Sequence, residues 1–284
     1  MNNNYGILYL VPTPIGNLKD ITLRALEVLK EVDIIAAEDT RQTLKLLNHF
    51  EIKKSLLSYH KHNEQAKGCE IVDKLKEGLN IAIVTDAGTP GISDPGAIIV
   101  QKCIEEDIKF EVLPGATAFT TALVYSGLDT TKFLFRGFIP RETKDRKILF
   151  EEIKNSKETL IFYESPHRIL STLTSLKENL GNRRIAICRE LTKVYEEILR
   201  GRIQDVIDKL SEKNIKGEFV IVLEGLTEEE IETQKREKWA SITIEDHIKL
   251  LIEEGLSKKE AIKEVARERK LPKNEVYKFS TEIK

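Results

Sequence analysis

The sequence is short of cysteine, of net charge and of glycine-rich nucleotide motifs, and each shortage excludes a class of protein. Its three cysteines, Cys69, Cys103 and Cys188, stand far apart without a C-x-x-C pair, which argues against a disulfide framework or a structural zinc site. We expect them to be small core residues. The net charge of -2 predicts no general attraction to polyanions, so any contact with nucleic acid must come from local patches.

Long apolar runs are also missing. No stretch reaches the roughly 20 apolar residues of a membrane span, and the first ten residues lack the basic region of a signal peptide. We therefore expect a cytosolic protein with no membrane contact. Neither G-x-G nor G-x-x-x-x-G-K-[ST] occurs, which removes support from dehydrogenase and P-loop interpretations.

What the chain does have is an alternation of short β-rich runs with helical patterns, typical of an α/β protein with crossover helices. The first series of runs covers residues 7–11, 33–37, 55–58, 81–84 and 108–113, and the second covers 133–138, 159–163, 184–188, 194–199 and 219–223. The second series has closely spaced runs, which favours a mixed sheet. Leu26 with Leu29, Leu44 with Leu47 and Val72 with Leu75 predict helix faces packed on the first sheet.

A length of 284 residues suits two α/β domains and a short appendage. We predict an N-terminal α/β domain over 1–115, a second with a mixed sheet over 116–225, an acidic linker over 226–240 and a helical domain over 241–284.

Glycine and proline gather just after three predicted strands, in residues 11–17, 86–96 and 113–118. In open α/β sheets, ligands bind outside the carboxyl ends of the strands, where glycine lets the backbone approach them. Each loop alone could be a tight turn. Three together, the longest carrying Asp86 and Asp94, favour a small-molecule site.

At these loops the chain resembles a known family. The segments PTPIGNLKDITLRAL, AEDTR, VTDAGTPGISDPG, LPGATA, FRGFIPR, YESPHR, RELTKVYEE and GEFVIVLEG are similar to the ribosomal RNA small-subunit methyltransferase I group of the tetrapyrrole methylase-like superfamily. The resemblance implies a class III methyltransferase fold, S-adenosylmethionine (SAM) in an interdomain cleft, and a homodimer. It also implies that the methyl acceptor is a cytidine ribose 2′-hydroxyl in small-subunit (16S) ribosomal RNA, as RNA or in the assembled subunit.

The resemblance further implies which residues bind the cofactor. They are Pro14, Ile15, Ala87, Gly88, Thr89, Ile92, Thr117, Ala118, Leu191 and Thr192. Thr89 stands where many tetrapyrrole-acting relatives carry an aspartate.

Methyl transfer from a sulfonium needs positioning and removal of the acceptor proton, and it needs no metal. We therefore expect no metal site. Charged residues at predicted strand ends are candidates to orient or deprotonate the hydroxyl, namely Glu164, Glu190 and Lys193, with Glu38 and Asp39 behind them. Ion pairing is the alternative role for each.

Candidate contacts to RNA are the cationic or imidazole side chains near these motifs. They are Arg41, His60, His62, Arg136, Arg141, His167, Arg168 and Arg189. Arginines suit phosphate, but the same side chains also form ordinary ion pairs. His60 and His62 could instead belong to a polar strand end, and Ser165 with Pro166 could simply start a helix.

The last residues predict three short helices. Ile244, Ile248, Leu251 and Ile252 share one helical face before Gly255, and Ser257 with Glu260 forms a capping-box pattern. From residue 256 on there are nine Lys or Arg against five Asp or Glu. This basic excess favours contact with RNA phosphates, although a helical cap packed on the catalytic body would also fit.

Two other functions stay open from the sequence. A superfamily methylase acting on a tetrapyrrole or another small molecule would keep the cofactor loops without the basic C-terminal helices. A non-catalytic RNA-binding adaptor would keep the basic surface and lose the glycine loops.

Overall fold

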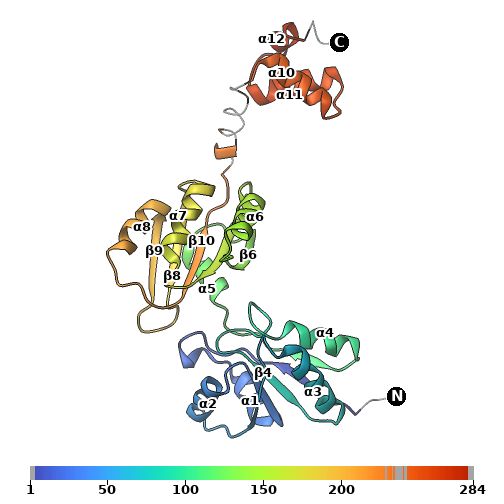
Figure 1. Ribbon diagram of the computed structural model, residues 1–284, viewed down its shortest axis with the longest axis vertical. Helices are drawn as coiled ribbons and strands as arrows, with labels where there is room; N and C mark the ends of the chain where they lie inside the picture. Colours follow the sequence, from blue (N-terminus) through green and yellow to red (C-terminus); the bar gives the residue numbers. More distant parts are fainter. Residues whose placement is uncertain (1–3, 228, 232, 234–238, 240–241, 281–284) are drawn as a thin grey trace. The chain divides into compact units, whose positions relative to one another are not determined.

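The computed structural model describes residues 4–227, 229–231, 233, 239 and 242–280. The chain divides into two compact units (Figure 1). One contains the chain up to Ile153 together with Glu158–Glu224, and the other contains Lys154–Lys157 together with the chain from Gly225 on. Among the helices that the structure describes, none combines the length and the hydrophobicity that a membrane span requires.

The first sheet of the larger unit is entirely parallel, with strand order β3-β2-β4-β1-β5. Its strands are β1 (Leu8–Leu10), β2 (Ile34–Ala37), β3 (Ser55–Ser58), β4 (Ile81–Val84) and β5 (Phe110–Val112). The predicted runs of the first series therefore all contain a strand. Because the strands are parallel, their carboxyl ends lie along one edge of the sheet.

Both faces of this sheet are covered by helices. The first set of helices comprises η1 (Leu18–Asp20), α1 (Leu23–Glu31), α2 (Thr40–His49), α3 (Glu64–Lys76) and α4 (Ala97–Glu105). Ile81 and Ile83 of β4 pack with α3 and α4, whereas Ala82 and Val84 pack with α1 and α2. The sequence of a strand that is buried on both faces is a continuous apolar run, and IAIV in β4 is an example.

The second sheet is mixed, as the sequence predicts, with strand order β6-β7-β10-β8-β9. Its strands are β6 (Phe133–Phe138), β7 (Thr159–Glu164), β8 (Arg184–Arg189), β9 (Glu197–Arg202) and β10 (Phe219–Leu223). β6 pairs with β7 in parallel, and β10 runs antiparallel to both β7 and β8. Its helices are α5 (Ala118–Ser126), α6 (Thr143–Ile153), α7 (Ile169–Leu180) and α8 (Ile203–Ser211).

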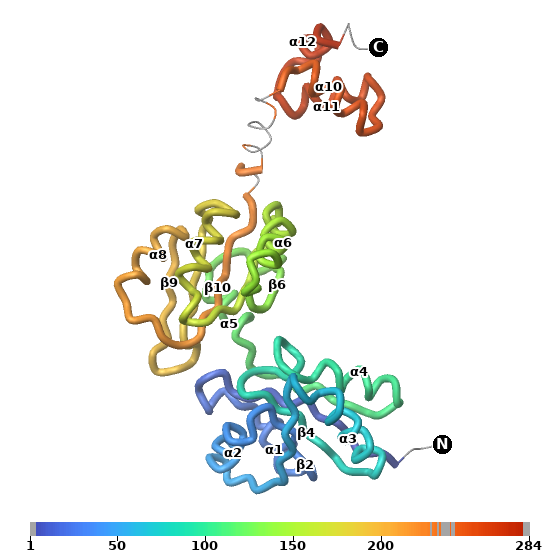
Figure 2. Tube along the Cα trace, viewed as in Figure 1, coloured from blue at the N-terminus to red at the C-terminus, as the bar shows by residue number. Residues whose placement is uncertain are grey.

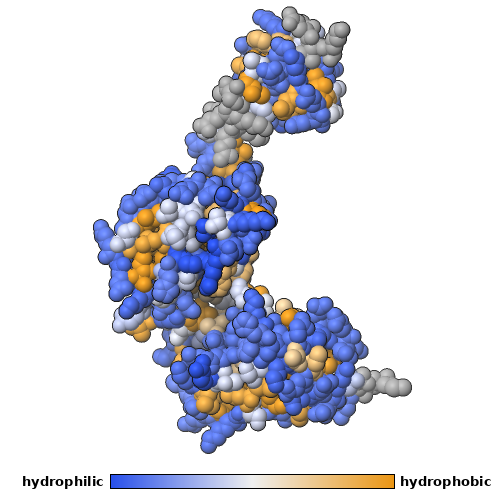
Figure 3. All heavy atoms as spheres, in the orientation of Figure 1, coloured by the Kyte–Doolittle hydropathy of each residue, from blue (hydrophilic) through white to orange (hydrophobic). Residues whose placement is uncertain are grey.

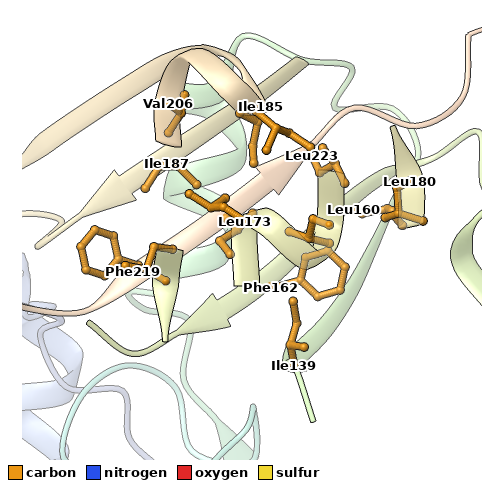
Figure 4. Close-up of a cluster of buried hydrophobic side chains, with 14 of the residues drawn as sticks. Ile139, Leu160, Phe162, Leu173, Leu180, Ile185, Ile187, Val206, Phe219 and Leu223 are labelled. Carbon is orange, nitrogen blue, oxygen red and sulfur yellow. The ribbon is translucent and has the colours of Figure 1, made fainter. Parts of the chain in front are cut away.

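The main core of this sheet lies under α6, α7 and α8. Figure 4 shows Phe162 and Leu160 of β7 beside Leu173 of α7, with Phe219 and Leu223 from β10 in the same cluster. The other face packs against α5 through smaller residues such as Ala186 and Cys188. The second sheet is thus also buried on both faces.

Three expectations are corrected by the structure. β9 begins at Glu197, three residues after the predicted start, and Val194 is 93% exposed in the loop before it. Leu44 does not face the sheet, because its side chain is 49% exposed while Leu47 is buried. Cys69 is exposed, whereas Cys103 and Cys188 are core residues as expected.

The described residues of the smaller unit from 242 on form α10 (Ile244–Glu253), α11 (Lys258–Arg269) and α12 (Lys273–Lys278), whose path is seen in Figure 2. The predicted capping box is confirmed, since Ser257 and Glu260 exchange side-chain to backbone hydrogen bonds. Gly255 follows α10 with φ +102°, which suits glycine at a helix end. The core contains Ile248, Leu251, Ala261, Ile262, Val265 and Val276.

The predicted linker over 226–240 lies largely outside the described residues. Where it is described, residues 229–231 are helical and the Thr227 hydroxyl accepts a hydrogen bond from the Glu230 amide at 3.1 Å. The first sheet ends at Val112 and the second begins at Phe133, so the division at 115/116 falls between the sheets and stays a prediction.

Candidate active site

Three loops meet at the carboxyl edge of the first sheet because β4, β1 and β5 are neighbours in it. The loop after β1 pairs with the loop after β4 through reciprocal hydrogen bonds between Thr13 and Gly88, at 2.9 and 3.0 Å. The loop after β4 reaches the loop after β5, since the Thr89 hydroxyl donates to the Ala116 carbonyl at 3.1 Å. The convergence expected from glycine and proline is therefore present.

Glycine is required at two positions of this arrangement. Gly88 has φ +85°, a left-handed conformation that side chains disfavour. A Cβ on Gly115 would lie 2.3 Å from the Cβ of Pro12, so only glycine lets the loops after β1 and β5 come this close.

A cavity of about 430 Å³ opens at these loops and is lined by residues from both sheets. Predicted cofactor residues that line it are Ile15, Ala87, Gly88, Thr89, Ile92, Thr117, Ala118 and Leu191. Two predicted cofactor residues, Pro14 and Thr192, do not line this cavity. Pro14 is buried and lines a neighbouring cavity, and the Thr192 hydroxyl accepts a hydrogen bond from the Asn17 amide at 2.9 Å.

Glu164 lies at the cavity, but both oxygens of its carboxylate are occupied by hydrogen bonds within the protein. One oxygen accepts from the Ser165 amide at 2.7 Å and from the Arg168 Nε at 2.9 Å. The other accepts from the Arg168 Nη2 at 2.6 Å and from the Thr172 hydroxyl at 2.7 Å. The side chain has no exposed surface. This network argues against Glu164 as the proton acceptor and favours a structural role.

Glu190 and Lys193, which follow β8 at the same edge of the second sheet as Glu164, form a charged cluster. The Lys193 ammonium donates to Glu190 and to Glu218, each at 2.9 Å. Burial alone would lower the pKa of Lys193, but these two carboxylates raise it above its usual value. Burial would raise the pKa of Glu190, yet the Glu218 amide and the Lys193 ammonium hold it below its usual range. Lys193 is therefore a cation near neutral pH and cannot accept the proton.

A second group of carboxylates lines the cavity and had a weaker signal in the sequence. Burial raises the pKa of Asp94 to about 7, and the charges of Glu38, Asp86 and Glu218 add to the rise. Burial, followed by the neighbouring Asp86, raises the pKa of Glu38. In the sequence, Glu38 was marked by its place at a strand end, and Asp86 and Asp94 by their place in the longest loop rich in glycine and proline. The cavity therefore has an acidic side, which suits a cationic ligand.

The predicted RNA contacts fall into two sets. Arg136 pairs with Glu152, Arg168 binds Glu164 and the Ile139 carbonyl, and Arg189 donates to the Lys216 carbonyl at 2.7 Å. These arginines have structural partners, so the sequence-based role in phosphate binding loses support for them.

The remaining predicted RNA contacts are more accessible. Arg141, His62 and His167 are exposed, and the side chain of Arg41 is 87% exposed beside Asp39. His60 is half-buried, and the centres of its ring and the His62 ring are 6.0 Å apart. The Nε2 atom of His60 lies 3.3 Å from the side-chain nitrogen of Asn63. Among the described residues, no group of three or more His, Cys, Asp or Glu side chains is placed to hold a metal ion.

The two sheets and the glycine-lined cavity define a class III methyltransferase. Residues 7–207 match the family model of the tetrapyrrole (corrin/porphyrin) methylases. Among solved structures, diphthine synthase covers 77% of this chain and 90% of its own at a TM-score of 0.61 and 13% identity. Uroporphyrin-III-C-methyltransferase from Thermus thermophilus covers 78% and 92% at a TM-score of 0.53 and 20% identity. At these identities the likeness shows the fold alone.

Curated relatives are far more similar. Proteins named ribosomal RNA small subunit methyltransferase I are 52% identical over 96% of this chain in Halalkalibacterium halodurans and 50% over 97% in Bacillus subtilis, covering 93% and 94% of those proteins. The chain belongs to the tetrapyrrole methylases and, within them, to the ribosomal RNA small subunit methyltransferase I family. It is an S-adenosylmethionine-dependent methyltransferase.

The cavity fits this cofactor. Ile15, Ala87 and Leu191 give the cavity apolar walls, which an aromatic base requires, and Gly88 adds backbone that a ligand can approach closely. SAM carries a sulfonium and an ammonium group, and the acidic side formed by Glu38, Asp86 and Asp94 complements both charges.

Proposed function

We propose that this chain transfers a methyl group from SAM to the 2′-hydroxyl of a cytidine ribose in small-subunit ribosomal RNA. The observation that carries the proposal is the 50–52% identity, over nearly the whole chain, to proteins named for methylating this RNA. Tetrapyrrole methylation has less support, because the uroporphyrin-III-C-methyltransferase named above is only 20% identical. A non-catalytic adaptor role has less support, because the glycine loops that line the cavity are intact.

The direct test is analysis of ribosomal RNA nucleosides by mass spectrometry. Cells lacking the gene should lose one 2′-O-methylcytidine from small-subunit RNA, and the wild-type gene should restore it. Unchanged nucleosides would refute the proposed substrate.

The cofactor is assigned to the cavity of about 430 Å³ described above, where it supplies the methyl group on its sulfonium. We assign its binding to the eight predicted residues that line the cavity, with Pro14 and Thr192 supporting them from behind. Gly88→Val should abolish SAM binding, because a branched side chain at φ +85° is strained, and Thr117→Arg should abolish it by filling the cavity. Calorimetry without added metal measures both. Wild-type affinity in both variants would refute this assignment.

For the acceptor, we assign Lys193 and Glu190 to orientation of the ribose hydroxyl. Lys193 can donate to the oxygen and hold it near the methyl group, while Glu190 fixes the ammonium in place. Lys193→Met should lower the single-turnover rate at saturating SAM by roughly 10²-fold, within the range for such groups. Glu190→Gln should have a smaller effect. If both variants react within about threefold of wild type, these charges serve only as ion pairs.

We further propose that the enzyme is a cytosolic homodimer. Four exposed residues support an interface on the second sheet's side: Val124, Tyr125, Val194 and Tyr195, with exposures of 76%, 41%, 93% and 77%. The Tyr125 hydroxyl lies 3.4 Å from Glu196, which joins α5 to the loop before β9. Exposed apolar clusters of this kind mark interfaces. Val194→Glu should convert a dimer to a monomer in light scattering, and a wild-type monomer would refute the proposal.

A further inference from the structure

A second cavity of about 450 Å³ lies beside the cofactor cavity. One wall is the loop after β1, another is formed by Gln42, Thr43, Lys45 and Leu46 of α2, and a third is the start of the loop after β4. Its volume falls within the roughly 300–1,000 Å³ of pockets for small ligands. Of the cofactor residues assigned above, those that also line the second cavity are Pro14, Ile15 and Ala87.

The two cavities share a wall. Ile15, Asp86, Ala87, Lys193 and Glu218 line both. A group that occupies the second cavity therefore meets the cofactor cavity at Asp86 and Lys193. The methyl acceptor has to come into contact with the methyl donor. With SAM in the first cavity, the adjoining second cavity is therefore the place for the acceptor.

We propose that the second cavity receives the acceptor nucleoside, rotated out of the RNA strand, and that Gln42 binds the edge of its base. The proposal rests on the proposed function. A nucleotide rotated out of the strand can enter a recessed cavity with both its ribose and its base, and RNA is commonly recognised through unstacked bases that are splayed out of the strand.

The orientation of Gln42 supports this assignment. The Lys45 ammonium donates to its side-chain oxygen at 3.2 Å. Lysine has only donors, so the atom it contacts is the amide oxygen, and the NH₂ group is left as the free end. Cytosine offers two acceptors, O2 and N3, on the edge that such a donor can bind. Leu18 and Leu46 supply apolar surface for the faces of the ring.

The surroundings also suit a nucleotide. Arg41 precedes Gln42 at the start of α2. Its guanidinium pairs with Asp39, yet the side chain is 87% exposed, so phosphates on either side of the flipped nucleotide can reach it. Thr43, one residue on, is buried and fixes the turn of helix that carries Gln42 and Leu46. The cavity thus combines apolar walls, an oriented amide and a nearby cation.

The test introduces a bulky side chain at a position of α2 that lines the second cavity. The control introduces the same side chain at a position of α2 that does not line it. Leu46→Trp places an indole in the cavity, whereas Leu44→Trp changes an exposed leucine of the same helix that does not line it. Three measurements are made on the full chain. They are SAM affinity by calorimetry, single-turnover methyl transfer to small-subunit particles from cells lacking the gene, and protection of the acceptor cytidine N3 from dimethyl sulfate with S-adenosylhomocysteine present.

We expect Leu46→Trp to bind SAM within about twofold of wild type, to lose the N3 protection, and to transfer methyl at least about 10²-fold more slowly. Leu44→Trp should match wild type in all three. Gln42→Ala, at an exposed position that does not threaten folding, should weaken transfer about tenfold at subsaturating particles, as expected when a hydrogen bond to the base is removed. Gln101→Ala, at an exposed position of α4, is its control.

The proposal is overturned if Leu46→Trp keeps both protection and transfer, or if Gln42→Ala matches Gln101→Ala. It is also overturned if Leu46→Trp remains folded and loses SAM affinity, since the cavity would then belong to the cofactor site. Failure of the proposed function looks different: the particles would gain no methyl group even with wild-type enzyme.

Discussion

At the scale of single residues, Glu164 shows how a strand-end carboxylate can be mistaken for a catalytic one. The motif YESPHR predicts that it lies beside the cavity, and the residue does line the cavity. Only the packing of α7 on β7 reveals that Arg168, Ser165 and Thr172 occupy both oxygens. The side chain therefore stabilises the fold at the cavity edge.

This role predicts a loss of stability. Glu164→Gln leaves the partly buried Arg168 without its counter-ion, and removing one partner of a buried pair costs about 3–5 kcal/mol. We expect urea unfolding to show a decrease near the low end of this range, because the Arg168 side chain is 24% exposed and partly screened. Thr172→Val, which removes a single hydrogen bond, should cost about 1 kcal/mol. A Glu164→Gln enzyme of full stability but impaired catalysis would instead restore the catalytic interpretation.

Asp94 predicts how stability depends on pH. Its pKa is raised to about 7 in the folded protein, well above the usual value of an aspartate, so the unfolded chain loses this proton first as the pH rises. The contribution of this group to the free energy of unfolding therefore decreases as the pH rises from about 4 to about 7, and it stays constant above about pH 7. Asp94→Asn should be more stable than wild type at about pH 8, and the difference should shrink towards about pH 4. Urea unfolding of both proteins at several pH values measures this.

If the stability difference did not change with pH, the raised pKa of Asp94 would be contradicted. Saturating SAM provides a second check. A bound cation favours the ionised carboxylate, so the pH dependence should move to lower pH in its presence.

At the scale of elements, the strands could be predicted and the site geometry could not. Runs such as IAIV and FVIVL are apolar throughout because both faces of each sheet are covered, and this makes them easy to recognise. The predicted start of β9 lies three residues early because Val194 and Tyr195 look like the start of a strand, although they are exposed in a loop. That Lys193 meets Glu218, 25 residues away, depends on the pairing of β8 with β10, which the sequence does not encode locally.

The capping box of α11 gives an element-scale prediction. Ser257 and Glu260 satisfy each other's amides at the first turn, and replacing such a serine by alanine typically costs about 1 kcal/mol. Ser257→Ala should lower the unfolding midpoint of the smaller unit, and calorimetry of that unit should show it. Lys259→Ala, at an exposed position of the same helix, is the control and should leave the midpoint close to the wild-type value. Equal effects would show that the cap contributes nothing special.

At the scale of the whole molecule, the smaller unit is a compact body of its own. The relative of the same name from Thermotoga maritima is 47% identical and matches over 99% of its own length, but over only 78% of this chain. Part of this chain thus has no counterpart in it. The basic excess after residue 256 and the largely polar face of this unit in Figure 3 support a role in RNA affinity.

We therefore predict that truncation after Gly225 leaves SAM affinity within about twofold and weakens binding to small-subunit RNA. The slope of log affinity against log salt should become shallower by roughly 0.7–0.9 for each phosphate that the shortened protein no longer neutralises. In the full chain, Lys259→Gln with Lys263→Gln should reproduce part of the change. An unaltered slope would mean that the helices only pack against the rest of the protein.

The buried carboxylate of Glu164 has a consequence for how the chain reaches its folded state. Its side-chain donors, Ser165, Arg168 and Thr172, all follow within eight residues along the sequence. The loop to be closed is short, so the ion pair can form as soon as the first turn of α7 does, before the distant strand β10 arrives. The charge is then neutralised locally before it is buried, and assembly of the second sheet never has to bring a bare anion into its interior.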